Sequence, residues 1–309
     1  MLKKVLAILL AVMIVLMCAA CGTAPEESAS ESKTEVVQAE QQKEEVAEEN
    51  EVEATSKPEI TFTEQLLVDD ENCTVKITGI EDDSIWGYTL KVLLENKTDV
   101  ELMFALDGVS VNGYMCDPFW GSAVTAGMKA NEEINFSVTS FEKSDITTPT
   151  DIQFTLRVSD YTDWMKEPLV EQDFVVYPMG EEAVQTYERA DHPEDVVLLD
   201  NESCKMVVTG YEIDDIWGYS MNLYLENKSD HDLMFSTDGV AVNGFMCDPF
   251  WGEVVKAGKR SNTAITWSGT AFEENGITEV EEIVLPVRIS DYNDWMKDPI
   301  VEETFTVNP

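Results

Sequence analysis

The chain is patterned mainly by a period-two alternation of apolar and polar residues. The run 88–94 places Tyr, Leu, Val and Leu on one face, and the run 152–158 places Ile, Phe, Leu and Val on one face. Such alternation predicts half-buried β-strands. Shorter alternating runs occur at 75–80, 134–138 and 174–176. About seven or eight short strands without a long helical period are typical of an antiparallel β-sandwich.

Turn signals separate these runs. Asn112-Gly113 lies between apolar segments, and Asn243-Gly244 repeats it. Asn-Gly favours a type I′ hairpin, because both central residues need positive φ. The segments 141–151 and 272–282 break the alternation and are expected to be crossing loops with a helical turn.

The strongest internal signal is a duplication. WGYTLKVLLENKTDVELMF begins at Trp86 and WGYSMNLYLENKSDHDLMF begins at Trp217, an offset of 131 residues. No insertion is needed to align 67–178 with 198–309. A unit of this length indicates two tandem domains rather than a solenoid. We therefore expect β-sandwich domains at 59–178 and 192–309, joined by a linker at 179–191.

The N-terminus has the layout of a secretory signal. Lys3 and Lys4 precede an uninterrupted apolar run at 5–17, and small residues then lead to Cys21. The run is shorter than the roughly 20 residues that cross a bilayer. The ending Cys-Ala-Ala-Cys-Gly resembles a bacterial lipobox, which predicts a signal peptide at 1–20 and a diacylated Cys21. The alternative is an ordinary signal cleaved after Ala20.

Charge and composition narrow the picture further. The segment 21–58 is rich in Glu, Ala, Ser and Gln and has no aromatic residue, so it is expected to be a disordered acidic tether. The whole chain carries 61 Asp and Glu against 20 Lys and Arg, a net charge of −41 at pH 7. This charge argues against nucleic acid as a partner. It also opposes self-association, so a monomer is expected.

A family resemblance appears in three phrases of the first repeat. These are GYTLKVLLENKTD, VSVNGYMCDPFW and SDYTDWMKEPLVEQDFVVYP. They resemble uncharacterised lipoproteins of clostridial-type Gram-positive bacteria with tandem immunoglobulin-like domains. The resemblance implies two immunoglobulin-like sandwiches held at the extracytoplasmic face of the cell membrane. It implies no catalytic residue and no known ligand.

Four cysteines remain after the signal and the lipid site. Cys73 and Cys116 in the first repeat match Cys204 and Cys247 in the second. Export permits oxidation, so one disulfide inside each domain is expected. The alternative is two pairs of buried free thiols. A zinc site is not expected, because neither pair has CxxC spacing.

Aromatic residues follow each predicted hairpin. The loop Asp-Pro-Phe-Trp places Phe119 and Trp120 in the first repeat and Phe250 and Trp251 in the second. Aromatic side chains in loops can stack on sugars or anchor a protein partner. These four residues are therefore the candidate ligand-facing positions. The alternative is that they close the ends of the sandwiches.

The sequence contains few residues that are typical of catalytic sites. The two histidines are His192, near the linker, and His231, which matches Val100 and so is absent from the first repeat. The chain has no GxSxG, HExxH or P-loop motif. Acidic clusters could bind Ca²⁺ through loop carboxylates, but they have no EF-hand spacing. We expect no enzyme activity, no cofactor and no metal site.

The sequence thus predicts a lipid-anchored surface lipoprotein with two immunoglobulin-like modules. Its expected role is non-catalytic binding at the cell envelope, with an envelope protein or a glycan as the partner and the membrane reached through the lipid anchor. One alternative is a carbohydrate- or wall-binding module. Another is a structural spacer or an accessory subunit of an envelope complex.

Overall fold

The computed structural model describes residues 62–309 except 85–86, 164, 186–188, 215–217 and 295. Residues 57–309 form one compact unit. The expected signal peptide, the lipid site at Cys21 and the acidic tether lie outside the described residues. Trp86 and Trp217, which open the two repeat phrases, also lie outside them. Within the described part of the chain, no helix is long and apolar enough to cross a membrane.

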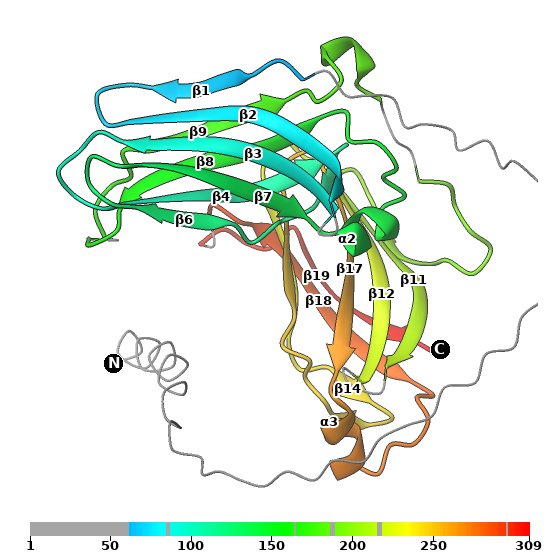
Figure 1. Ribbon diagram of the computed structural model, residues 1–309. Coiled ribbons are helices and arrows are strands. Elements are labelled where there is room, and N and C mark those ends of the chain that lie inside the picture. Colours follow the sequence, from blue (N-terminus) through cyan, green and yellow to red (C-terminus); the bar gives the residue numbers. More distant parts are fainter. Residues whose placement is uncertain (1–61, 85–86, 164, 186–188, 215–217, 295) are drawn as a thin grey trace, which may run out of the picture. The chain divides into compact units, whose positions relative to one another are not determined.

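The first repeat folds into two sheets that face each other across a core (Figure 1). The first sheet has the order β1-β2-β3-β7, and in the second β6, β4, β8 and β9 lie side by side. The first sheet contains β1 Gln65–Asp69, β2 Cys73–Ser84, β3 Gly87–Asn96 and β7 Lys129–Phe136. The second contains β4 Leu102–Val111, β5 Tyr114–Met115, β6 Gly121–Val124, β8 Ile152–Asp160 and β9 Val170–Val176.

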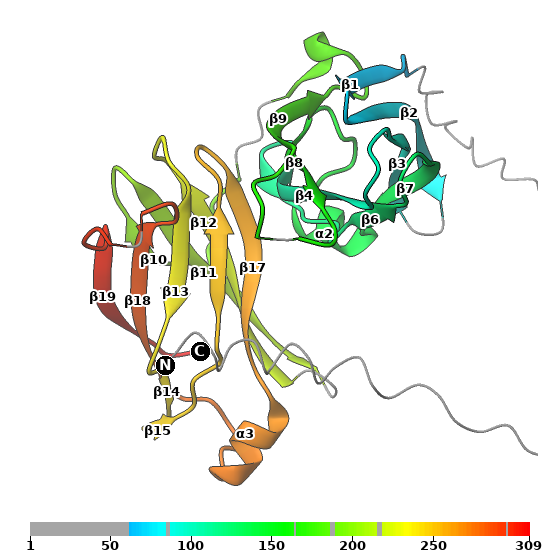
Figure 2. The same ribbon diagram turned by 90° about the vertical axis from the view of Figure 1, so that its left-hand side faces the viewer.

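The second repeat copies this arrangement (Figure 2). One sheet has the order β10-β11-β12-β17, and the other is built around β18 and β13. The first sheet contains β10 Val196–Asp200, β11 Cys204–Asp214, β12 Gly218–Asn227 and β17 Arg260–Trp267. The second contains β13 Leu233–Thr237, β14 Ala241–Val242, β15 Phe245–Met246, β16 Gly252–Val255, β18 Ile283–Asp291 and β19 Val301–Val307.

The strand order is immunoglobulin-like, as expected. In the first repeat β2, β3 and β7 occupy the places of strands A, B and E, and β4, β8 and β9 those of C, F and G. β6 pairs with β4 antiparallel, like the added strand C′ of variable-type domains. The part of the chain that the structure describes is therefore mainly β, with two tandem immunoglobulin-like sandwiches. The linker between them includes a 3₁₀ turn at Glu181–Ala183.

The alternating pattern is confirmed in the core. Along β8 the even-numbered positions are buried and the odd-numbered positions are half-buried. The buried positions include the apolar residues of the run 152–158. Leu90 from one sheet and Leu156 from the other belong to the same core. The period of two is what directs one face of each strand inward.

Both predicted hairpins are present. Asn112 and Gly113 have φ of 51° and 82°, and Asn243 and Gly244 have φ of 51° and 80°. The Asn112 side chain also accepts a hydrogen bond from the Thr150 N–H at 2.7 Å. The turn residue thus fixes the segment that leads into β8 in addition to closing the hairpin.

The helical turns begin earlier than predicted. α2 spans Val138–Lys143 and α3 spans Gly269–Glu274, so each helix starts directly after the preceding strand rather than at the phenylalanine. Ser268 caps α3, because its side chain accepts from the Ala271 N–H. The apolar period of two continued through Val138 in the sequence, yet Val138 lies in the helix and is half exposed.

The expected disulfides are not formed: the four cysteines among the described residues are buried free thiols. Cys73 pairs with Asn96 at one end of β3. Cys116 lies beside Ser140 of α2. The helix α2 follows β7, whose last residue Phe136 pairs with Tyr88 at the other end of β3. At roughly 3.3 Å per residue, that end lies about 26 Å away. Disulfide-bonded Cα atoms lie within about 7 Å, so the pair cannot be bridged.

The second repeat separates its cysteines in the same way. Cys204 pairs with Asn227, whereas the Cys247 carbonyl accepts the Trp267 Nε1–H at 2.7 Å, next to Tyr219 at the far end of β12. Export and the matched pair in each repeat had suggested the bridges. The sequence carries no information on which end of the sandwich each cysteine occupies, so it could not exclude them.

Candidate functional site

The Asp-Pro-Phe-Trp loops connect the hairpin of each repeat to the next strand. In the first repeat the Phe119 N–H donates to Asp117 Oδ1 at 2.7 Å, a local Asx turn. Phe119 and Phe250 both adopt the left-handed backbone conformation, with φ of 50° and 49°. For a residue with a side chain this conformation costs about 1–2 kcal/mol.

The phenylalanine side chains point into solvent. Phe119 is 93% exposed and Phe250 is 99% exposed. An apolar ring of this size is ordinarily buried, with a gain of about 1.5–3 kcal/mol. Two unusual features therefore coincide at matched positions of both repeats: a strained backbone and an uncovered aromatic ring.

The neighbouring tryptophans lie differently. Trp120 packs against the core of the first repeat, and Trp251 packs against the core of the second. The Trp251 Nε1 is buried and has no hydrogen-bond partner among the described residues. The two tryptophans are thus half-buried against the cores of the sandwiches, unlike the exposed phenylalanines beside them. The sequence places each tryptophan next to a phenylalanine. It does not reveal that the phenylalanine has a left-handed backbone conformation, which turns the two side chains apart.

A second pair of loops also presents apolar side chains. Tyr161 and Met165 are 52% and 79% exposed after β8, and Tyr292 and Met296 are 52% and 74% exposed after β18. These residues were not among the candidate ligand-facing positions. The signal that could have found them is the SDY-x-DWMK phrase, which occurs in both repeats.

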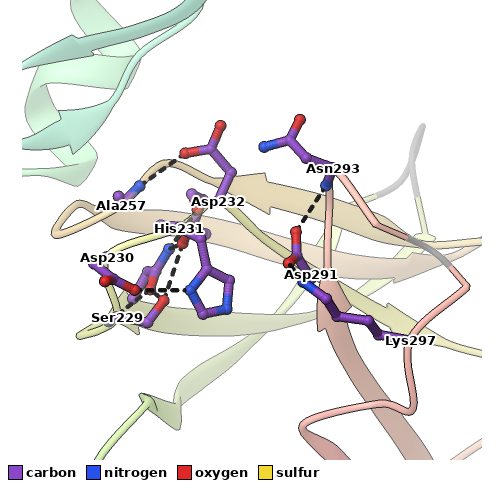
Figure 3. Close-up of polar contacts among 10 residues, drawn as sticks. Ser229, Asp230, His231, Asp232, Ala257, Asp291, Asn293 and Lys297 are labelled. Atoms are coloured by element: carbon purple, nitrogen blue, oxygen red, sulfur yellow. Dashed lines mark hydrogen bonds and ion pairs between the residues drawn. The ribbon is translucent and has the colours of Figure 1, made fainter.

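The acidic residues of these loops are engaged locally (Figure 3). Asp291 Oδ1 accepts the Asn293 N–H at 3.0 Å, and its Oδ2 lies 3.0 Å from Lys297 Nζ. The hydrogen bond from Lys297 lowers the pKa of Asp291. Asp160 is held in the same manner, since the Thr162 hydroxyl and N–H lower its pKa. These carboxylates shape their own turns.

His231 lies beside this loop in a hydrogen-bonded turn (Figure 3). Its Nδ1 is 3.0 Å from Asp230 Oδ1, and this bond lowers the pKa of Asp230. The Ser229 hydroxyl donates to the His231 carbonyl at 2.9 Å, not to the ring. Asp232 is occupied by Lys256 Nζ at 2.8 Å. The polar atoms here support the turn rather than a nucleophile and base pair.

Across the described residues, no group of three or more His, Cys, Asp or Glu side chains is arranged to hold an ion.

Comparison with known proteins gives weak similarities. No protein-family model matches the chain. No curated protein matches it significantly. Among solved structures, the chain is 12% identical to the CsuC–CsuE chaperone–tip adhesion subunit pre-assembly complex from archaic chaperone-usher Csu pili of Acinetobacter baumannii, covering 71% of this chain and 90% of that one with a TM-score of 0.20.

A second structure, the YadV chaperone, is 14% identical, with 72% of this chain and 92% of that chain covered and a TM-score of 0.17. TM-scores this low support no inference. The assignment of the fold rests on the strand order and the buried faces described above.

Proposed function

We propose that the chain is a lipid-anchored lipoprotein of the cell envelope that binds a protein partner through Phe119 and Phe250. The observation that carries the binding proposal is the nearly complete exposure of these two rings on left-handed backbone at matched positions. Residues held in sparsely populated backbone conformations cluster at binding sites. Exposed aromatic rings are the usual anchors of protein interfaces.

Binding would be passive and without catalysis. The backbone that carries each ring has a defined left-handed conformation, so little backbone freedom is lost when the ring enters a pocket. Covering one ring contributes about 1.5–3 kcal/mol. Two similar modules in one chain can bind bivalently, which raises the overall affinity. Because the chain has a net charge of −41, the partner surface around the pocket is expected to be basic.

A photo-crosslinking experiment in the native cell tests this proposal. A photoreactive phenylalanine analogue is placed at position 119 or at position 250. The control position is Tyr161, which is half-exposed and lies in the same repeat as Phe119. The expected result is one shared protein adduct from positions 119 and 250. An adduct of equal yield from position 161, or none from 119 and 250, contradicts the proposal.

The same cross-linked material separates a protein from a glycan partner. Protease treatment is expected to remove the adduct, and wall-degrading glycosidases are expected to leave it. The reverse result would support the carbohydrate- or wall-binding alternative. The variants Phe119→Ala and Phe250→Ala should lose binding with unchanged melting temperature, since neither ring contributes to a core.

The lipid anchor is tested separately. Cells grown with a labelled fatty acid should label the wild-type chain and not the Cys21→Ser variant. Two acyl chains suffice for stable anchoring, so the wild type should remain with membranes and the variant should be released. An unlabelled wild type would favour the ordinary signal peptide.

A further inference from the structure

The two repeats contact each other through the hairpin of the first and the start of β17 in the second. The Arg260 N–H donates to the Gly113 carbonyl at 3.0 Å. Arg260 and Tyr114 are opposed in a parallel bridge between β17 and β5. The guanidinium carbon of Arg260 lies 6.0 Å from the centroid of the Tyr114 ring. The hairpin therefore docks by a main-chain hydrogen bond and a cation–aromatic contact.

Side chains beside this bridge complete the contact. Lys259 Nζ donates to Gln153 Oε1 at 2.7 Å. Met115 of the first repeat packs against the core of the second, and Tyr224 of the second joins the core of the first. Tyr224 is buried as a result, with 4% exposed. The interface between the repeats thus combines apolar contacts with polar pairs, among them the hydrogen bond from Asn262 Nδ2 to Ser144 Oγ at 3.2 Å.

The offset of 131 residues gives the second repeat its own copy of the docking hairpin. Phe245 and Met246 form β15 and match Tyr114 and Met115. Tyr114 is 4% exposed, whereas Phe245 is 47% and Met246 is 69% exposed. Within the described residues β15 pairs with β14 and with no further strand. The docking side chains of the hairpin are present but uncovered.

The receiving edge also has an uncovered copy. β7 of the first repeat matches β17, and in the part of the chain that the structure describes it is the last strand of its sheet. Met128 precedes it and is 58% exposed. Lys129 at its start has a side chain that is 60% exposed. The first repeat therefore keeps free the strand edge that the second repeat uses.

The cation–aromatic pair is conserved between these two free surfaces. Lys129 takes the place of Arg260, and Phe245 takes the place of Tyr114. Arg260 lies 3.7 Å from Glu226 while it faces the ring. Lys129 lies 3.0 Å from Glu95, the residue that matches Glu226. The cation on the free edge is thus held by the same partner as the one that is already docked.

On the two free surfaces, an apolar pair of residues stands in place of one polar pair of the interface between the repeats. Lys259 and Gln153, which hydrogen-bond across the interface, match Met128 and Val284 on the two free surfaces. Both members become apolar together. A single change would have placed a methionine against an amide, whereas the double change places one apolar side chain against another, so the two free surfaces remain complementary.

We propose that a second copy of this chain docks the edge of its β7 on the free β14–β15 hairpin, repeating the contact that joins the two repeats. The contact is head to tail, and each added copy again offers one free hairpin and one free β7 edge. Such a heterologous contact builds rings or open chains of molecules rather than an isologous dimer. The monomer that net charge predicts is then the state at low concentration and low salt.

Between separate copies, this contact forms without a covalent linker to hold the two surfaces close together. The interface between the repeats is helped by the linker, which supplies an effective concentration on the order of 1 mM. A contact that is formed at this effective concentration is expected to be populated between separate copies at or below about 1 mM. Crowding of anchored copies on a membrane raises its population further. Because both partners are acidic, screening by salt is expected to strengthen association.

Sedimentation velocity of residues 57–309 tests the proposal, since both cores lie within this unit. Runs at up to about 1 mM protein in about 0.15 M and about 1 M salt are compared, where the Debye length is about 8 and 3 Å. The wild type is expected to form species larger than a dimer, more so at high salt. Met246→Glu and Met128→Glu are each expected to stay monomeric, and Met296→Glu, at an equally exposed methionine elsewhere, to behave as wild type.

Mixing the two variants tests the direction of the contact. The Met246→Glu chain keeps an intact β7 edge and the Met128→Glu chain keeps an intact hairpin. Their mixture should form a 1:1 dimer and nothing larger. A wild type that stays monomeric at high salt, variants that associate unchanged, or a mixture that stays monomeric would each overturn the proposal. Equal melting temperatures show that the variants are folded.

Discussion

The Arg189 guanidinium binds the Asp195 carboxylate in a bidentate ion pair. Nη1 lies 2.7 Å from Oδ2 and Nη2 lies 2.6 Å from Oδ1. The guanidinium also lies over the Tyr224 ring, 5.3 Å from its centroid. The hydrogen bond from Arg189 lowers the pKa of Asp195 to about 2. This pair fastens the end of the linker to the second repeat.

Asp195→Asn should lower stability in a pH-dependent way. The carboxyl pKa is about 2 in the folded chain and about 3.9 when unfolded. Its contribution, about 2 kcal/mol, is therefore fully present above about pH 4 and is lost as the pH falls through about 2. Urea unfolding at several pH values should show a difference from wild type at pH 7 that shrinks below pH 4.

Asp191→Asn is the matched control for this experiment. The Asp191 side chain is 82% exposed and lies 3.4 Å from Lys205. Exposed pairs of this kind contribute little, so a change below about 0.5 kcal/mol is expected. A pH-independent loss in Asp195→Asn would show that the carboxylate charge is not what stabilises the linker.

Asn96→Ala should destabilise the first repeat by about 3 kcal/mol. The buried Asn96 Nδ2 donates to the Val100 and Val124 carbonyls at 2.7 and 2.8 Å, and its Oδ1 accepts the Thr98 N–H at 2.9 Å. Alanine leaves these groups without their partner. Chemical denaturation measures the loss, with the exposed Asn131→Ala on β7 as a control expected to change little.

The second repeat offers an independent copy of that test. Asn227 Nδ2 donates to the His231 and Val255 carbonyls, both at 2.8 Å. Asn227→Ala should therefore cost about as much as Asn96→Ala. A small effect in both variants would mean that water replaces the amide at these turns.

The four thiols should be unreactive in the folded protein. Burial raises the pKa of Cys73 to about 11 and of Cys116 to about 12, so the reactive thiolate is scarce at neutral pH. Iodoacetamide applied to residues 57–309 should leave the intact mass unchanged, and should modify all four after urea is added. Rapid labelling of native protein, or a mass that shows oxidised pairs, would contradict the geometry.

Gly218→Ala should be far more damaging than Gly258→Ala. Both glycines have positive φ, 98° and 68°. A Cβ at Gly218 would collide with the Trp267 carbonyl and approach the Gly269 nitrogen to 2.7 Å, whereas a Cβ at Gly258 meets nothing within 4 Å. Backbone strain alone costs about 1–2 kcal/mol, so Gly258→Ala should lose that much and Gly218→Ala clearly more. Comparable melting temperatures for the two variants would contradict the predicted steric clash at Gly218.

Particular residues show which features the local sequence determines and which it does not. Asn112-Gly113 specified its hairpin, because few dipeptides accept two positive φ angles in succession. Val138 was misassigned, because an apolar residue fits the outer turn of a helix as well as the end of a strand. For Phe119 and Trp120, the sequence indicated an aromatic loop and could not say which ring was outside.

The sequence by itself determined the strands, the duplication and the sandwich class, since these follow from local alternation and turn chemistry. Only the tertiary structure decided that Cys73 and Cys116 lie at opposite ends of a sandwich, that Phe119 and Phe250 are uncovered, and that the β5 and β15 hairpins differ in what covers them. Those properties depend on which segments meet in space, and residues distant along the chain set them through packing that no local pattern records.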